Sequence, residues 1–247
     1  MSTPVPAVDR IVVAFDSYCP AGAALELALQ LAGPVAQSVH ALYVEESDAL
    51  TLGAFPWARE VALATAESRP VLQEVLEREF SSRAAAAQAL FNAMAAGTRS
   101  ASFERVRGHM AEELRRTATN AAGILLDWPP ARRRSRSWAR MVARTLLELR
   151  APFVGLVEAG KVRASALLIV RSQQGSGRAH ELACRLMRGE AAQTTEFRGQ
   201  VTAAAVLERA RQVQAGALLV EQDAAADAEA LLAELASRWS GSLLLLR

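Results

Sequence analysis

The sequence predicts an α/β fold, with mainly parallel sheets flanked by helices and organised as two unequal domains. Short aliphatic runs alternate with segments whose apolar residues recur at helical spacing, which is typical of a parallel sheet covered on both faces. The same order of segments returns in shorter form in the last third of the chain. The 247 residues, of which 51% are hydrophobic, are enough for one large domain or two small ones.

Five aliphatic runs in the first part of the chain predict five strands. Each run is short and bounded by polar or small residues, as in strands buried on both faces. The runs cover residues 10–16, 38–44, 101–107, 123–127 and 151–157. The acidic residues 45–48 are expected to form a loop that closes the second strand.

Segments with helical spacing lie between these runs. They cover residues 21–32, 57–97, 110–121 and 134–149. Gly33 and Pro34 end the first of them. Pro70 interrupts the second, because proline removes a backbone donor and clashes with the preceding turn. Residues 57–97 are therefore expected to form two helices or one bent helix.

The last third of the chain repeats part of this plan. Residues 166–172 resemble residues 11–17, and residues 196–221 resemble residues 105–127. Matched residues lie further apart along the chain in the first pair of segments than in the second. The later copy is therefore shorter, and it lacks about one strand and the long helical segment. We predict an α/β domain over residues 1–160 and a truncated copy over residues 161–247. The copy ends in a strand over 242–246, and the two domains pack through a two-fold-like pairing.

Composition excludes several classes of protein. Lys and Arg number 28 against 26 Asp and Glu, so generic nucleic-acid binding has no electrostatic basis. No apolar run approaches the ~18 residues of a spanning helix, and the first residues lack a signal-peptide pattern, so we expect a cytoplasmic protein without a membrane span. Cys19 and Cys184 lie far apart without CxxC spacing, which argues against a metal site, a redox pair or a disulfide framework.

The order and spacing of these segments resemble the universal stress protein family. The resemblance covers roughly residues 9–158, with a weaker echo over 163–247. The matching segments are the first strand with Asp16, the helix over 21–32, the strand end Tyr43–Val44, Arg107–Glu113 and the run 123–126. The chain is similar to the tandem form, in which two such domains face each other as two subunits do in the dimeric form. The resemblance implies adenine nucleotide alpha hydrolase-like domains and a role in the stress response.

The resemblance also implies a ligand site. In nucleotide-binding members, the Asp after the first strand meets adenine and the end of the second strand adds backbone contacts. These positions correspond to Asp16, followed by Ser17, and to Val44. Gly108 and His109 end the third strand on the same side, at the rim where open α/β sheets bind ligands.

The glycine-rich stretch that holds phosphates in the family is missing. Its pattern is Gly, two residues, Gly, nine residues, Gly-Ser, because glycines let backbone N–H groups approach phosphate oxygens. Residues 127–144 contain no glycine, and Asp127 lies where the family usually has a small residue. The second copy has Arg171 as the counterpart of Asp16, and acidic residues within 221–227 replace the phosphate loop. Both nucleotide sites are therefore expected to be degenerate.

Arginines gather in the segment that follows the fourth strand. Within residues 132–150 the only acid is Glu148, and the basic residues are Arg132, Arg133, Arg134, Arg136, Arg140, Arg144 and Arg150. Helical spacing places Arg133, Arg136, Arg140 and Arg144 on one face. Such a face meets solvent or an acidic partner, or binds phosphate through guanidinium groups.

No catalytic pattern is present, since His40, His109 and His180 belong to no HExxH or paired Cys/His motif and GxSxG is absent. We predict a regulatory or adaptor-like binding protein without catalysis, cofactor or metal, which acts through a protein partner or as a homo-oligomer. The alternative is a stress-response protein that binds ATP or another adenine nucleotide through Asp16, Val44 and the Arg132–Arg144 cluster. A third reading has the arginine face dock an acidic protein or membrane surface. The candidate binding residues are Asp16, Ser17, Val44, Gly108, His109, Arg133 and Arg136.

Overall fold

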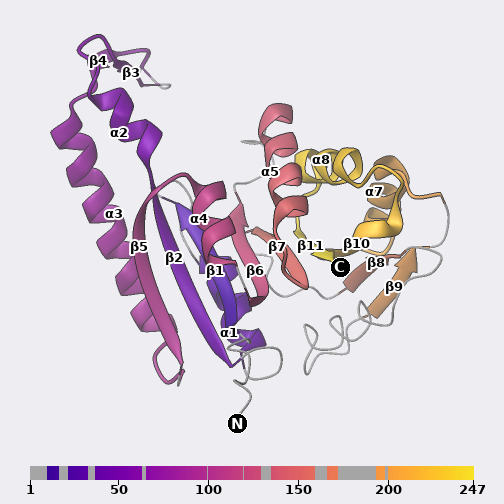
Figure 1. Cartoon of the computed structure of the whole chain (residues 1–247). Helices are drawn as coiled ribbons and strands as arrows, with labels where there is room; N and C mark the ends of the chain where they lie inside the picture. The colour runs from indigo at the N-terminus through magenta and orange to yellow at the C-terminus, as the bar shows by residue number, and fades with distance from the viewer. Residues whose placement is uncertain are drawn as a thin grey trace.

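A nine-stranded sheet runs through the centre of the protein (Figure 1). The computed structural model describes residues 10–16, 22–32, 37–62, 65–98, 100–118, 120–128, 135–158, 166–171, 193–197 and 200–247. The strands of the sheet are β1 (Arg10–Asp16), β2 (Ser38–Glu46), β5 (Ala101–Gly108), β6 (Ala121–Trp128), β7 (Phe153–Glu158), β8 (Ala166–Val170), β9 (Gln193–Phe197), β10 (Ala217–Glu221) and β11 (Ser242–Leu246). Their order across the sheet is β5-β2-β1-β6-β7-β11-β10-β8-β9.

Two parallel halves of this sheet meet at one antiparallel pair. The strands β5, β2, β1, β6 and β7 are parallel to their neighbours, as are β11, β10, β8 and β9. At the junction β7 runs antiparallel to β11, with Leu156 opposite Leu243 and Phe153 opposite Leu246. The strand order is therefore approximately symmetric about this junction, with β11, β10 and β8 in the places of β7, β6 and β1. The division into domains at residues 160 and 161 stays a prediction.

The strand β9 lies beside β8 because the second half of the sheet is shorter than the first. Its sequence resembles that of β5, yet it pairs with β8 as β2 pairs with β1. Because the second half has no further strand between them in this sheet, the strand that resembles β5 lies directly beside the counterpart of β1.

Helices cover both faces of the sheet. On one face pack α4 (Met110–Thr117), α5 (Arg136–Glu148), α7 (Ala203–Gln212) and α8 (Ala228–Arg238), and on the other pack α1 (Gly22–Leu31) and α3 (Gln73–Met94). Alternate residues of β1 point to opposite faces of the sheet: Val12 packs in the core under α4, α5, α7 and α8, and Val13 packs in the core under α1 and α3. This coverage explains why the strands of the centre are aliphatic at nearly every position.

A projecting segment of the chain, which we call the tip, departs from the prediction. It consists of α2 (Ser47–Gly53), the short antiparallel strands β3 (Arg59–Val61) and β4 (Ser68–Pro70), and the residues that join them to α3 (Figure 1). The expectation of helix from residue 57 was wrong, because residues 59–61 and 68–70 form a hairpin and α3 begins only at Gln73. A two-stranded hairpin leaves both edges free, so the missing N–H of Pro70 is tolerated there.

The acidic residues 45–48 also differ from the expected loop. The strand β2 continues through Glu46 because its pairing with β5 extends to Gly108, and α2 begins at Ser47. The other predicted strands are confirmed, with boundaries that shift by a few residues. The helix predicted over 110–121 ends earlier, at Thr117, because β6 already begins at Ala121.

Candidate functional site

The carboxyl ends of the five parallel strands β5, β2, β1, β6 and β7 form one rim of the sheet. Neighbouring strands place Asp16 of β1 opposite Val44 of β2, and Glu46 of β2 opposite Gly108 of β5. The backbones of the two residues predicted to meet adenine are thus adjacent, and the side chain of Val44 is buried. Ser17 and Arg133, also predicted for this site, lie outside the described residues. The roles assigned to all of these residues stay predictions.

A carboxylate lies at the point where this rim meets α1. Asp127, near the end of β6, accepts a hydrogen bond of 2.8 Å through Oδ1 from the backbone N of Ala24, in the first turn of α1. Backbone N–H groups in a first turn have no partner within the helix, and the positive end of the helix dipole favours a negative charge. Asp127 therefore occupies a helix N-terminus of the kind that binds phosphate in other α/β proteins.

A second group of side chains gathers where β2, α2 and α4 adjoin. The Nδ1 atom of His109 lies 3.9 Å from Oε2 of Glu46 and 3.7 Å from Oδ2 of Asp48. A side chain at position 108 would crowd Glu113, since a Cβ there would lie 3.0 Å from its Oε1 atom, and Gly108 avoids this contact. The sequence identified His109 but missed both carboxylates, because residues 45–48 read as a loop. Extending the pairing of the two strands by two residues would have found Glu46.

The neighbouring Glu45 has a structural role. Successive residues of a strand point to opposite faces, so Glu45 points away from Glu46. Its side chain is only 3% exposed and receives a 2.7 Å hydrogen bond from Nε of Arg105, and Arg107 lies 3.4 Å away. Two guanidinium groups thus compensate one buried carboxylate.

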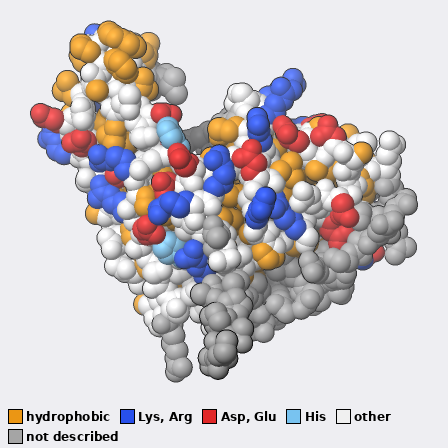
Figure 2. Space-filling view, viewed as in Figure 1, with side chains coloured by type: hydrophobic (Ala, Val, Ile, Leu, Met, Phe, Trp, Pro, Cys, Tyr) orange, Lys and Arg blue, Asp and Glu red, His pale blue; other side chains and the backbone are white. Residues whose placement is uncertain are grey.

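The arginines of α5 face acids of the same chain. Arg136 and Arg140 line a groove of about 870 Å³ together with Asp227, Glu229 and Glu234 from the start and middle of α8. Figure 2 shows basic and acidic side chains interspersed over these two helices. Arg136 begins α5, the helix that follows the carboxyl end of β6, and its predicted role at the rim stays a prediction.

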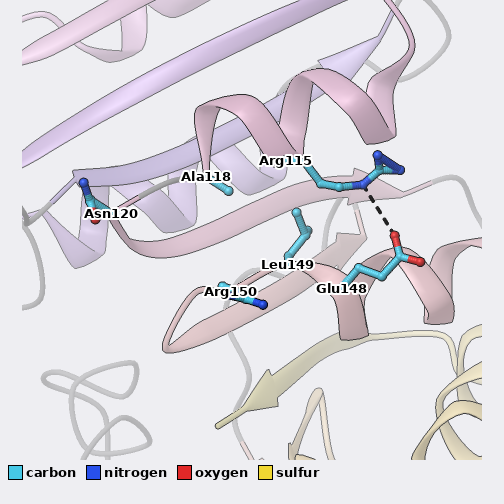
Figure 3. A pocket seen from close by; sticks show the side chains of 6 residues that line it. All are labelled: Arg115, Ala118, Asn120, Glu148, Leu149 and Arg150. Atoms are coloured by element: carbon cyan, nitrogen blue, oxygen red, sulfur yellow. Dashed lines mark ion pairs between the residues drawn. The ribbon is translucent and has the colours of Figure 1, made fainter.

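The remaining arginine of the predicted face has a local partner. Nε of Arg144 lies 3.2 Å from Oε1 of Glu148, one turn further along α5. Glu148 also pairs with Arg115 of α4, at 3.4 Å, across a smaller pocket of about 430 Å³ that Asn120 and Arg150 line as well (Figure 3). Asn120 directly precedes β6, so this pocket lies near the amino end of that strand, away from the rim.

Apolar side chains gather on the tip. Trp57 is 71% exposed and its ring stacks on that of Phe55 with 5.1 Å between ring centres. Figure 2 shows hydrophobic side chains covering most of the tip. The large exposed ones are Leu52, Phe55, Trp57, Val61 and Leu72. Exposed apolar surface concentrated in one place marks an interaction surface more often than a scattered residue does.

Comparison with known proteins gives the class of fold. A universal stress protein from Archaeoglobus fulgidus superposes with a TM-score of 0.57 at 11% sequence identity, over 97% of this chain and 96% of that one. A functionally unknown protein from Pseudomonas aeruginosa PAO1 has the same TM-score at 13% identity, over 97% of this chain and 92% of that one. The fold is therefore that of the universal stress proteins.

Sequence comparison adds nothing to this assignment. No family model matches the chain, and no curated protein matches it. Among the described residues, none of the helices combines the length and the apolar character needed to cross a bilayer.

Proposed function

We propose that this chain is a stress-related regulatory or adaptor-like binding protein that works without catalysis and without a bound nucleotide at its rim. The observation that carries the proposal is the Asp127 carboxylate at the N-terminus of α1. A triphosphate placed there would meet a fixed negative charge, and the glycines that would let backbone N–H groups surround it are missing between residues 127 and 144. The cytoplasmic location expected from the sequence stays a prediction.

The charges of α5 support the same conclusion. Binding phosphate through side chains requires guanidinium groups whose field is not already compensated. Arg136 and Arg140 share their groove with a third arginine, Arg238, and with three carboxylates from the N-cap and the body of α8. Arg238 pairs with Glu234 at 2.7 Å, and an anion entering the groove beside Arg136 and Arg140 would be repelled by Asp227 and Glu229.

One observation favours the alternative, an adenine-nucleotide-binding protein. The pairing of β1 with β2 sets Asp16 beside Val44, as the resemblance requires for adenine contacts. Under this alternative the Arg132–Arg144 cluster supplies the phosphate contacts that the glycines would otherwise make.

A calorimetric titration of the full chain with ATP, ADP and AMP separates the two functions. We expect no heat of binding, and a dissociation constant in the low micromolar range would overturn the proposal. If binding is found, the double substitution Arg136→Ala, Arg140→Ala should abolish it under the alternative. Arg115→Ala is the matched control, because Arg115 lies on α4, outside this cluster, and pairs with Glu148 at 3.4 Å.

The tip supplies the surface for an adaptor role. Its exposed aromatic pair and neighbouring aliphatic side chains offer the rigid apolar area that protein partners bury at the centre of interfaces. It extends beyond the sheet, so a partner can reach it without covering the rim (Figure 1). We assign the protein partner of the chain to this surface.

A further inference from the structure

Three side chains with metal-binding atoms meet at the base of the tip. Glu46, Asp48 and His109 each present one such atom, and the three atoms lie within 4.8 Å of one another. Ligand atoms around a tetrahedral zinc ion lie about 3.3–3.5 Å apart, as bond lengths near ~2.1 Å require. The two distances from His109 Nδ1, 3.9 Å and 3.7 Å, exceed this separation by only a few tenths of an ångström. Small rotations of the exposed His109 and Asp48 side chains would close the gap.

The backbone around this group is fixed by regular structure. Glu46 ends β2 and lies opposite Gly108 of β5, so the residue after that glycine, His109, is held next to it. The carbonyl oxygen of His109 accepts hydrogen bonds of 3.0 Å from the N–H groups of Glu112 and Glu113, which lie in the first turn of α4. The ligands thus come from a strand end, a helix start and a helix cap, and not from a long loop.

One ligand is also oriented by a hydrogen bond. The Oε1 atom of Glu46 accepts a 3.1 Å bond from the backbone N of Met110. This bond leaves Oε2 turned towards His109. Carboxylates that bind metals are commonly held in this way by a donor on their second oxygen, which fixes their direction before the ion arrives.

The charge balance favours a cation at this position. Within the described residues, the ion-pair partner recorded for Glu46 and for Asp48 is His109, and neither carboxylate pairs with an arginine. The adjacent Glu45, by contrast, has two arginines. Two carboxylates beside one imidazole leave a local excess of negative charge, which a divalent cation compensates.

We propose that Glu46, Asp48 and His109 bind a divalent first-row transition-metal ion of the zinc type. The imidazole nitrogen selects against Mg²⁺ and Ca²⁺, which prefer ligand sets made of oxygen only. Three protein ligands leave at least one position for water or for a ligand supplied by a partner. This inference departs from the expectation of no metal, which rested on the absence of cysteine and histidine motifs, and it does not depend on the proposed function.

The test is calorimetric titration of the metal-free full chain with ZnCl₂. We expect one ion per chain, and we expect His109→Ala and Asp48→Asn each to weaken binding at least about ten-fold. Glu46→Gln should weaken it as well while keeping an oxygen for the Met110 N–H. The matched control is His40→Ala, because His40 also faces a carboxylate, Glu104 at 3.1 Å, but is in no group of three metal-binding side chains within the part of the chain that the structure describes. This variant should bind as the wild type does.

Three results would overturn the proposal. The first is no binding of Zn²⁺ by the wild type. The second is unchanged affinity in His109→Ala and Asp48→Asn, which would place the ion elsewhere in the chain, for instance on a cysteine. The third is displacement of Zn²⁺ by an equal concentration of Ca²⁺, which would mean that the imidazole is not a ligand. Circular dichroism of each variant confirms the fold, and Asp48, whose side chain is 79% exposed, should tolerate replacement.

Discussion

Removing the Asp127 carboxylate should destabilise the protein without creating a nucleotide site. The bond from Ala24 N to Asp127 Oδ1 joins α1 to β6 across 103 residues of chain. In Asp127→Ala a partly buried N–H of the first helical turn loses its acceptor. A helix cap is worth ~1 kcal/mol and a hydrogen bond to a charged group ~2 kcal/mol, so we expect a loss of about 2 kcal/mol. For a chain of this size that loss lowers the melting temperature by about 4–8 °C.

Urea denaturation followed by circular dichroism measures this loss, and two further variants locate its cause. Asp127→Asn keeps an acceptor oxygen and removes only the charge, so it should cost less than Asp127→Ala. Asp227→Ala is the matched control, because Asp227 Oδ1 caps α8 through the N–H of Ala230 at 2.9 Å in an exposed, local bond; it should cost ~1 kcal/mol.

Two outcomes would refute this reasoning. Equal losses for the Asn and Ala variants would mean that the hydrogen bond contributes little. A gain of ATP affinity in Asp127→Ala would mean that this carboxylate alone blocks the nucleotide, since the chain would then bind phosphate without the missing glycines.

Gly123→Ala should destabilise the protein by ~3 kcal/mol or more, because a Cβ at this position would lie 2.0 Å from the ring of Phe153. Gly22→Ala is the control, since a Cβ there would have nothing within 4 Å and should cost no stability. The melting temperatures of the two variants check this, and equal values would contradict it. Burial lowers the pKa of His40 from its ordinary 6.5, so the unfolded chain takes up the proton first and stability falls as the pH drops below 6.5. His40→Gln should therefore lose less stability than the wild type between pH 7 and pH 5, and parallel urea midpoints across that range would count against the idea. Trp57→Ser should leave the melting temperature unchanged, because this side chain is 71% exposed, while reducing self-association in light scattering if a second copy is the partner of the tip. A lower melting temperature would show that the tip packs against the rest of the chain.

Much of the sheet could be predicted because burial on two faces leaves a plain pattern in the sequence. Residues 11–15 and residues 243–246 are apolar without interruption, and they lie in strands that have the predicted bounds, 10–16 and 242–246. The hairpin at residues 59–70 has no buried face, so its two three-residue strands carry no alternation that could be recognised. The alanine-rich helix that follows it obscured the boundary further.

The candidate site was predictable only in part. Asp16 and Val44 are adjacent because they lie at or near the ends of two strands that the sequence places in order. The sequence alone also indicates that a carboxylate at position 127 is unfavourable beside a phosphate. Its bond to Ala24 could not be foreseen, since it depends on where α1 begins relative to β6. The group formed by Glu46, Asp48 and His109 joins residues about sixty positions apart, and such proximity depends on the register of β2 with β5.

The antiparallel junction between β7 and β11 also has a consequence for synthesis of the chain. As the protein emerges from the ribosome, the first five strands of the sheet can pair while β7 still has one open edge. That edge has no native partner until residues 242–246 have been made. An aliphatic edge of this kind can recruit strands of other chains, and the delay exposes it for as long as the second half takes to appear. A strand that lies inside the completed sheet is thus open to mispairing while the chain is being made.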